Sequence, residues 1–291
     1  AIISIIKINF LLIKRIMKLN NKNSNLNYKL TPKQIQKYSR HIVMPQIGSI
    51  GQRRLLNSKV LIIGAGGLGS PVSIYLTLAG IGKIGIIDMD TVEISNLQRQ
   101  ILHTEKDIGI KKTESAKNSL ISYNSDLVIE TFDEPLSSNN ALDIFSNYDI
   151  IVNGADNFPA RYLANDAAFL TNKPLVDGSI LLFDGQLSTY LPKKGCYRCL
   201  FPTPPKPGEV PSCAEAGVLG MLPGIVGSIQ ATETVKLILN IGETLSNKLL
   251  LVDALNMEFK TITYKKNPDC VLCGNNPTVK ELIDYEFFCG L

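Results

Sequence analysis

An apolar strand that runs directly into a glycine-rich turn constrains the fold of this chain more than any other feature. Residues 59–63 read KVLII. The turn that follows reads GAGGLG, with glycines at Gly64, Gly66, Gly67 and Gly69. Glycine lets the backbone approach a ligand closely, and the amides at the start of the next helix attract phosphate. A second apolar strand at residues 84–88 completes a β-α-β unit, which predicts a parallel sheet buried on both faces.

Six further apolar segments are predicted to form strands, and their spacing changes along the chain. They lie at residues 127–132, 150–153, 175–177, 186–190, 248–253 and 260–264. Helical patterns separate the earlier segments, whereas the later ones have the short spacing of hairpins. Near the start, Thr31 followed by Pro32 predicts a helix that runs to about Val43. We therefore expect a Rossmann-like α/β fold, with a mixed, mostly parallel sheet flanked by helices.

The chain divides into a leader, one large domain and a tail. Of its 291 residues, 45% are hydrophobic, which is typical of a globular protein and excludes disorder of the whole chain. The domain is expected at residues 31–275, preceded by a leader at 1–30 that is predicted to be disordered or not native, and followed by a tail at 276–291. Lys7 and Lys14 interrupt the apolar start of the leader, which is also too short to span a membrane. No membrane partner is expected.

Charge is distributed unevenly along the chain. All 26 acidic residues lie from Asp88 onward, whereas residues 1–87 hold 13 of the 30 Lys and Arg. Such an asymmetry can indicate a nucleic-acid or polyphosphate partner. Much of the basic excess lies in the leader, however, without the interleaved aromatic residues that stack on bases. We therefore expect no nucleic-acid partner and assign phosphate binding to selected basic residues only.

Four of the six cysteines form two CxxC pairs. Cys196 and Cys199 make the first pair, Cys270 and Cys273 the second, and 70 residues separate the pairs. Two chelating pairs of thiolates are the usual ligands of a closed, structural zinc site, because four thiolates leave no open position for catalysis. A redox-active CxxC is the weaker alternative, since neither pair opens a thioredoxin-like unit. Unpaired thiols also imply a reducing compartment, such as the cytoplasm or a plastid stroma.

The glycine turn is followed, at the expected spacing, by an acidic residue. Asp88 lies 24 positions after Gly64, at the end of the second strand, where it can accept hydrogen bonds from a ribose. The turn and the acid together predict an adenine nucleotide without saying which one. An NAD-dependent dehydrogenase is the usual interpretation of this pair.

A polar run directly beyond this acid favours a triphosphate over NAD. The run contains Asp90, Ser95, Asn96, Arg99 and Lys112. A dehydrogenase needs no cluster of Arg, Lys and Asn at this place, whereas a triphosphate needs several donors to offset its charge. The alternative is a solvated polar helix and loop with no ligand.

The pattern DxDxVxxSNLxRQ after GxGGxG resembles the E1-type superfamily, in particular the ThiF/MoeB/HesA-type adenylyltransferases that activate sulfur carriers in molybdopterin and thiamine biosynthesis. The resemblance covers about residues 31–275. It implies ATP-dependent adenylylation of the C-terminal glycine carboxylate of a ubiquitin-like carrier of the MoaD or ThiS kind, ending in Gly-Gly. An NAD-dependent dehydrogenase, or a non-catalytic module that binds nucleotide or a ubiquitin-like protein, is the alternative function.

The resemblance also implies roles for single residues of the nucleotide site. Gly67 would lie against the nucleotide and Asp88 on the ribose. The residues implied to contact the phosphates are Asn96, Arg99 and Lys112. Because a carboxylate is already a nucleophile at neutral pH, such a site needs positioning and charge stabilisation rather than a general base.

Two further matches concern the metal and the oligomeric state. Asp156 and Asn157 match the family's acid-Asn pair, and Asp156 can hold Mg²⁺ through oxygen ligands. Alternatively, this aspartate caps the helix that begins near Phe158. Arg40 resembles the arginine that a partner subunit inserts into the active site, which implies a homodimer.

A fifth cysteine and the tail carry the last expectations. Cys213 follows a proline-rich stretch at residues 202–211. Some related enzymes use a cysteine here to form a thioester or an acyl-disulfide with the carrier, and others do without it. A small apolar residue packed under the loop is an alternative of nearly equal weight. Residues 276–291 resemble the connector that precedes a rhodanese domain in some relatives. The sulfur donor is therefore expected to be a rhodanese or a cysteine desulfurase.

Overall fold

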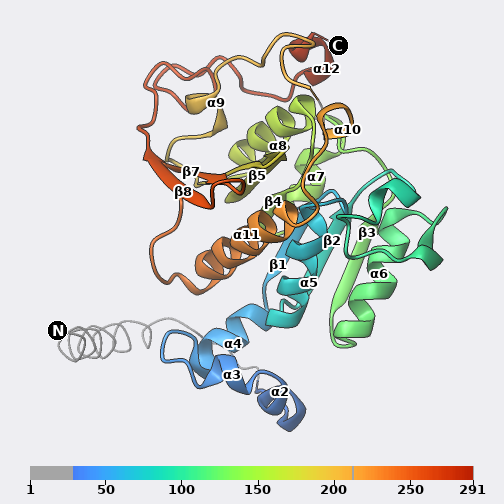
Figure 1. The fold of residues 1–291 in the computed structure, drawn as a ribbon. Coiled ribbons are helices and arrows are strands. Elements are labelled where there is room, and N and C mark those ends of the chain that lie inside the picture. The colour runs from blue at the N-terminus through green and yellow to red at the C-terminus, as the bar shows by residue number, and fades with distance from the viewer. Residues whose placement is uncertain (1–28, 212, 291) are drawn as a thin grey trace.

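The computed structural model describes residues 29–211 and 213–290, with the side chains of residues 213 and 214 excepted. Figure 1 shows these residues as a ribbon in which helices surround one twisted sheet. Residues 1–28 of the expected leader lie outside the described part of the chain.

The described residues form one sheet of eight strands in the order β3-β2-β1-β4-β5-β6-β7-β8. The strands are β1 Lys59–Ile63, β2 Lys83–Ile87, β3 Val128–Phe132, β4 Ile150–Asn153, β5 Leu175–Leu181, β6 Asp184–Tyr190, β7 Lys248–Asp253 and β8 Glu258–Thr263. Pairing is parallel from β3 to β5 and antiparallel from β5 to β8. The predicted mixed, mostly parallel sheet is therefore confirmed.

The helices fall between the strands much as the apolar periodicity predicts. They are α2 Pro32–Lys37, α3 Ser39–Ile42, α4 Gly48–Leu56, α5 Gly69–Ala79, α6 Lys112–Tyr123, α7 Ala141–Ser146, α8 Phe158–Leu170, α9 Tyr197–Leu200, α10 Cys213–Ala216, α11 Leu222–Leu239 and α12 Tyr285–Cys289, with 3-10 turns η1 Ile94–Asn96 and η2 Glu105–Asp107. None of the helices in the described part of the chain is long and apolar enough to cross a membrane.

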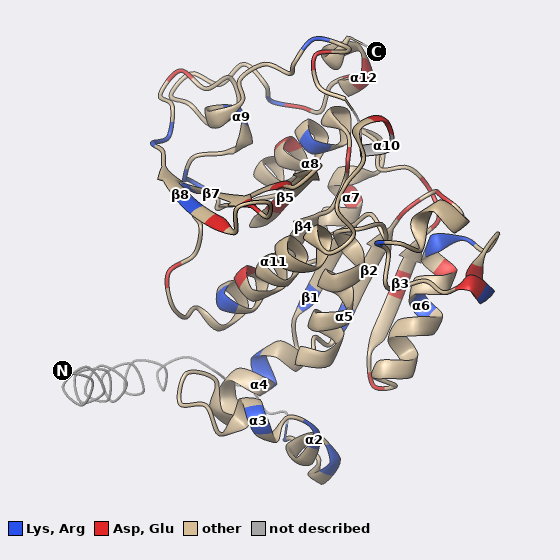
Figure 2. Ribbon diagram, viewed as in Figure 1, with Lys and Arg blue, Asp and Glu red and all other residues tan. Residues whose placement is uncertain are grey.

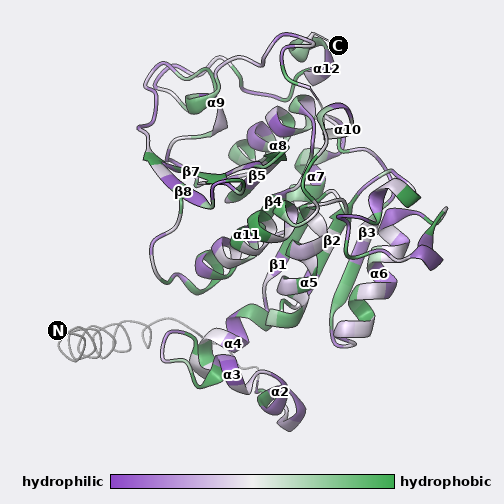
Figure 3. Ribbon diagram, viewed as in Figure 1, coloured by the Kyte–Doolittle hydropathy of each residue, from purple (hydrophilic) through white to green (hydrophobic). Residues whose placement is uncertain are grey.

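The central strands are buried on both faces. Val60 and Ile62 of β1 belong to the core that α4, α5, α6 and α11 cover, whereas Leu61 and Ile63 belong to the core under α7 and α8. This alternation is the two-residue period of a strand. Figure 3 shows the hydrophobic colouring of the strands between helices that carry both kinds of residue. The apolar run of β1 thus reflects burial on two sides, as expected for a parallel sheet.

The single helix predicted from Thr31 to about Val43 is wrong, because the chain breaks it at Tyr38. Helix α2 ends at Lys37, its C-cap Tyr38 has backbone angles (φ −99°, ψ 16°) that are not helical, and α3 follows. The Tyr38 ring is buried against Gly80, and its hydroxyl accepts a hydrogen bond from Asn124. Burial of this ring therefore overrides the local helical pattern.

Candidate active site

A cavity of about 1120 Å³ opens at the carboxyl ends of the parallel strands. Ile63 at the end of β1, Ile87 at the end of β2 and Gly154 directly after β4 line it. Ligands of open α/β sheets bind at this edge. Pockets for small ligands measure roughly 300–1,000 Å³, so this one has room for more than a nucleotide.

The cavity brings together most of the nucleotide-site residues that the sequence predicts. Its lining includes Gly64, Gly66, Gly67, Asp88, Asp90, Arg99, Lys112, Asp156 and Asn157. Three predicted residues, Gly69, Ser95 and Asn96, do not line it. Arg40 and the four cysteines of the CxxC pairs lie elsewhere.

The glycine turn needs its glycines for backbone packing. Gly64 adopts φ +86°, in the left-handed region. A Cβ on Gly69 would lie 1.8 Å from the carbonyl oxygen of Gly64, which no side chain tolerates. A Cβ on Gly67 would lie 3.3 Å from Cγ of Pro223 on α11. The turn is thus folded tightly against itself and against α11, with its backbone exposed to the cavity.

Two side chains hold the peptide groups of Ala65, in the middle of the glycine turn. The Ala65 amide donates to Oδ2 of Asp88 over 2.8 Å, and Nε2 of His103 donates to the Ala65 carbonyl over 2.9 Å. Ser115 Oγ lies 2.8 Å from Nδ1 of His103 and donates to it in this tautomer. Burial lowers the pKa of His103, so the ring is neutral near pH 7. Sequence reasoning assigned this histidine no role, because its partners lie far away along the chain.

Asp88 accepts a backbone amide with each of its carboxylate oxygens. Its Oδ1 accepts the Asp90 amide over 2.9 Å, while its Oδ2 accepts that of Ala65. Burial raises the pKa of Asp88, and the charge of the nearby Lys112 partly opposes this rise. Each carboxylate oxygen has two lone pairs, so a ribose hydroxyl can still donate to this group.

Two cationic side chains, Arg99 and Lys112, line the cavity. Lys112 is buried and donates to Oδ2 of Asp90 over 2.7 Å. Arg99 is half-buried, and its Nη1 donates to the carbonyl oxygen of Ser95. An ammonium has three protons, so Lys112 can bind a phosphate without releasing Asp90. Ser95 therefore supports Arg99 through its backbone.

Asn96 is buried behind this region rather than in the cavity lining. Its Oδ1 accepts the backbone amide of Glu93 over 3.0 Å at the start of η1. The structure therefore places Asn96 where it shapes the turn that carries Arg99. The next residue of the same run, Gln100, does line the cavity, and its buried Oε1 has no hydrogen-bond partner among the described residues.

The loop after β4 separates the roles of its two polar residues. Asn157 is the N-cap of α8 and accepts the amide of Ala160 over 2.9 Å. Asp156 is exposed, lines the cavity and is not the cap. Its carboxylate therefore remains available for a metal ion at the carboxyl end of β4. The capping alternative that the sequence left open applies to its neighbour.

A buried arginine on α8, Arg161, holds this loop through hydrogen bonds to its backbone. Arg161 Nη2 donates to the carbonyl oxygens of Ala155 over 3.3 Å and of Gly178 over 2.9 Å. Its Nη1 lies 3.4 Å from Oδ2 of Asp177, whose Oδ1 accepts from Asn153. The arginine thereby ties the Asp156 loop to β5. Sequence reasoning did not identify Arg161, because its partners lie in the loop after β4 and in β5.

Arg40 lies at the opposite end of the sheet from the cavity. It is exposed on α3, which precedes α4 and the amino end of β1 (Figure 1). The charged residues of α2, α3 and α4 are all basic (Figure 2). Within one chain, Arg40 therefore does not contribute to the cavity.

The four cysteines of the CxxC pairs gather in one place. Their sulfur atoms all lie within 4.8 Å of one another, and no disulfide joins them. Cys196 Sγ lies 3.6 Å from Cys270 Sγ, and Cys199 Sγ lies 3.3 Å from Cys273 Sγ. Tetrahedral zinc with bonds of about 2.3 Å needs sulfur atoms about 3.8 Å apart, so these residues fit zinc. The predicted pairing of distant segments at a four-cysteine cluster is confirmed.

Cys213 marks the start of α10, directly after the proline-rich stretch. Val210 and Pro211, just before it, line the cavity. Its side chain lies outside the described residues, so its chemistry stays a prediction.

The ThiF family model matches residues 38–272. The sulfur carrier protein adenylyltransferase of Thermus thermophilus is 50% identical over 267 residues, which cover 90% of this chain and 98% of that protein. The adenylyltransferase and sulfurtransferase MOCS3 of Culex quinquefasciatus is 48% identical, and this chain spans 60% of its length. The structure of E. coli MccB with ATP superposes with a TM-score of 0.73 at 26% identity, covering 88% of this chain and 75% of MccB.

These comparisons agree with the geometry of the cavity. The family and the class of enzyme predicted from the sequence, an adenylyltransferase, are confirmed. The predicted alternative of a dehydrogenase finds no support in the named relatives, which are adenylyltransferases. This chain belongs to the ThiF family.

Proposed function

We propose that this chain adenylylates the C-terminal glycine carboxylate of a ubiquitin-like sulfur-carrier protein, using ATP and releasing pyrophosphate. The observation that carries the proposal is a single cavity that unites the glycine turn, two phosphate-facing cations and an available carboxylate. The carrier class comes from the relatives, one of which is named for a sulfur carrier protein.

The residues divide the work of the reaction between them. The carrier carboxylate attacks the α-phosphorus of ATP, and pyrophosphate leaves in line with the attack. Arg99 and Lys112 offset the charge that develops on the phosphates. Asp88 and the glycine turn hold the ribose and the phosphates, so that the two reacting groups meet in the right orientation. No base is needed, which agrees with a neutral His103 that is used to hold backbone.

Asp156 is the residue proposed to hold Mg²⁺, at the carboxyl end of β4. The ion would supply charge neutralisation for the triphosphate. The Asp156 carboxylate fits this task because Asn157, and not Asp156, caps α8. Arg161 keeps the loop in place beneath it.

A homodimer would complete the cavity. Arg40 is exposed on α3 and does not line the cavity of its own chain, so a second copy of the chain is the proposed recipient. A guanidinium from the partner would add a third cation to the phosphate site. The oligomeric state and the loss of activity in Arg40→Ala test this part of the proposal.

The four cysteines are proposed to hold a structural zinc ion, and Cys213 a covalent sulfur-transfer intermediate. The proposed location is a reducing compartment, the cytoplasm or a plastid stroma, and the free thiols of the described cysteines support it. The sulfur donor is proposed to be a rhodanese or a cysteine desulfurase. We also propose that residues 276–291 are a connector to a rhodanese domain. The name of MOCS3 supports this proposal, because it includes a sulfurtransferase and this chain spans 60% of that protein.

ATP-pyrophosphate exchange with candidate carriers tests the function. We expect exchange only with a carrier that ends in Gly-Gly, and none when the last glycine is deleted. ATP-Mg²⁺ and NAD are compared as ligands by calorimetry in parallel. Binding of NAD in preference to ATP-Mg²⁺ would support a dehydrogenase, whereas ATP binding without exchange for any carrier would support a non-catalytic module.

A further inference from the structure

A buried ion pair starts inside the first CxxC pair. Arg198 lies between Cys196 and Cys199, and its Nε and Nη2 donate to the two oxygens of Asp166 over 2.9 and 2.7 Å. Both side chains are almost completely buried, with exposed fractions of 2% and 0%. A buried pair is stabilising only when its geometry is good and its remaining groups are satisfied. Here the contact is bidentate, so the position of Arg198 is closely defined.

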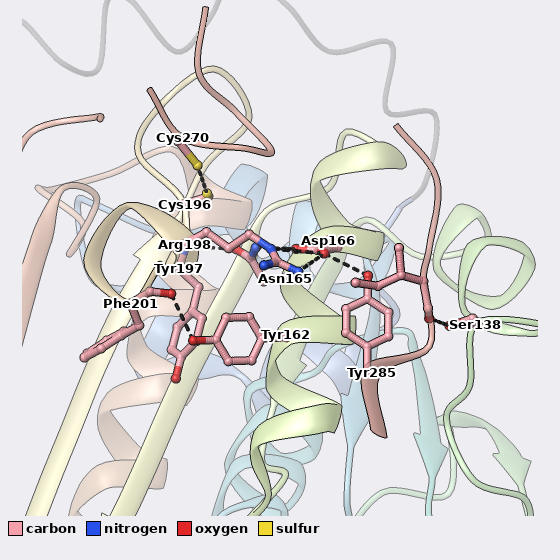
Figure 4. Close-up of polar contacts among 11 residues, drawn as sticks. Ser138, Tyr162, Asn165, Asp166, Cys196, Tyr197, Arg198, Phe201, Cys270 and Tyr285 are labelled. Atoms are coloured by element: carbon pink, nitrogen blue, oxygen red, sulfur yellow. Dashed lines mark hydrogen bonds and ion pairs between the residues drawn. The ribbon is translucent and has the colours of Figure 1, made fainter. Parts of the chain in front are cut away.

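The pair continues into the segment that precedes and forms α12. The Tyr285 hydroxyl donates to Oδ2 of Asp166 over 2.8 Å. The Arg198 guanidinium lies over the rings of Tyr162 and Phe288, 4.9 and 4.6 Å from their centroids. Figure 4 shows Asp166 between Arg198 on one side and Tyr285 on the other, near the cysteines. Residues 282–289, which we name the strap, are therefore joined to the cysteine cluster through a continuous set of contacts.

A second set of contacts joins α9, which carries Arg198, to α8. The Tyr197 backbone amide donates to Oδ1 of Asn165, and the side-chain Nδ2 of Asn165 donates to Oδ1 of Asp166, both over 2.9 Å. The backbone around Cys196 and Cys199 therefore fixes Asp166 from two directions. An Asp166 that lost Arg198 would be an uncompensated buried charge.

The strap also forms part of the wall of the cavity. Residues Ile283, Asp284, Tyr285 and Glu286 line it, together with Asp156. Ser138, another lining residue, donates to the carbonyl oxygen of Ile283 over 2.6 Å. One side of the strap thus contacts the Asp166 ion pair and the other faces the substrate space.

We propose that the four-cysteine site positions this wall of the cavity, acting through Arg198, Asp166 and Tyr285. The metal would fix α9, α9 would hold Arg198, and Asp166 would pass the restraint to the strap. The glycine turn is held separately, by Asp88 and His103. The inference rests on metal binding by the cysteines and not on the identity of the carrier, so it can fail while adenylylation stands.

Two measurements on the full chain loaded with zinc test the coupling. The first is hydrogen exchange of residues 282–289 in Tyr285→Phe, which removes only the hydroxyl. Loss of a buried hydrogen bond should accelerate exchange of the strap by roughly fivefold to tenfold, with no change in the glycine turn. Phe287→Ala is the matched control, because Phe287 belongs to the same helix and is 81% exposed.

The second measurement uses the reciprocity of coupled sites. If the metal restrains the strap, a loosened strap must lower the affinity of the site for the metal. We expect the zinc affinity, measured by competition with a chromogenic chelator, to be severalfold lower in Tyr285→Phe than in the wild type or Phe287→Ala, with the folded protein present throughout. Equal zinc affinities of the three proteins, or equal exchange of the strap in Tyr285→Phe and Phe287→Ala, would overturn the proposal.

Discussion

The glycine-turn side and the strap side of the cavity are held in different ways. On the first side, the glycine turn, Asp88 and Arg99 follow one another within residues 64–99 of the chain. On the strap side, the wall depends on contacts between residues far apart, such as Asp166 and Tyr285, which are 119 positions apart. The glycine-turn side is thus built from neighbouring segments, whereas the strap and the cysteine cluster must be assembled by the completed fold.

This difference predicts how the effects of substitutions divide. Substitutions on the glycine-turn side should affect nucleotide binding and catalysis directly. Substitutions in the cysteine cluster should first affect the stability of the protein and the cavity wall. We expect the largest effect at the glycine turn and the smallest at His103.

Among these substitutions, Gly69→Ala should have the largest effect, because it disrupts the glycine turn. The new Cβ would lie 1.8 Å from the Gly64 carbonyl oxygen, so the turn must move. We expect the free energy of unfolding to fall by more than about 4 kcal/mol and measurable ATP binding to be lost. Gly224→Ala is the control, because a Cβ there has nothing within 4 Å. Chemical denaturation and calorimetry measure both quantities; ATP binding of wild-type strength in Gly69→Ala would show that the turn is not part of the site.

Asp156→Ala and Asn157→Ala should separate chemistry from capping. Loss of the Asp156 carboxylate should lower carrier-dependent exchange by about 10³-fold with little change in stability. Asn157→Ala should instead cost about 1 kcal/mol of stability through loss of the N-cap, with activity largely retained. Exchange rates and denaturation midpoints of the two variants check this. The reverse pattern would show that Asp156 is not the residue that binds the metal.

Cys270→Ser tests the other side of the comparison, the four-cysteine site. A missing thiolate opens the four-cysteine site, so we expect loss of the bound zinc and of about 3 kcal/mol of stability. ATP affinity should change by less than about threefold in the folded fraction, because Asp88 and His103 hold the glycine turn independently. Metal analysis and calorimetry measure these effects. Full stability without metal would show that the cysteines have no structural role.

His103 should give a small dependence of stability on pH. Its folded pKa is lowered by burial, so the unfolded chain binds more protons as the pH falls below about 6.5. Stability should therefore decrease as the pH is lowered from about 7 to about 5. In His103→Gln this part of the slope should vanish, at a cost of about 1 kcal/mol at neutral pH. Urea denaturation at several pH values compares the slopes; identical slopes would exclude His103 as their source.

The sequence predicted what depends on neighbours along the chain. Strands β1 and β4 were predicted from their apolar runs. The cavity residues Asp88 and Arg99 were predicted from one contiguous pattern, and Lys112 from the polar run that continues beyond it. The zinc cluster was predictable despite its separation, because two closely spaced pairs of thiols are typical of a structural zinc site. The single helix predicted from Thr31 to about Val43 was wrong, since the ring of Tyr38 is buried against Gly80 and its hydroxyl is bonded by Asn124, both from other elements.

Residues that hold backbone across elements gave no signal in the sequence. His103 contacts Ala65 from 38 positions away, and Arg198 contacts Asp166 from 32. Arg161 joins the loop after β4 to β5 in the same manner. Polar residues of these types are usually found on the surface, so only the fold shows that they are buried and paired.

The most direct test of the central claim is detection of the product itself. A Gly-Gly carrier is incubated with the protein and ATP-Mg²⁺, and the intact carrier is analysed by mass spectrometry. We predict AMP attached to the terminal glycine, with the adduct absent for Asp156→Ala and retained for Asn157→Ala. Pyrophosphate release without any carrier-AMP adduct, or no reaction with any Gly-Gly carrier, would contradict the account.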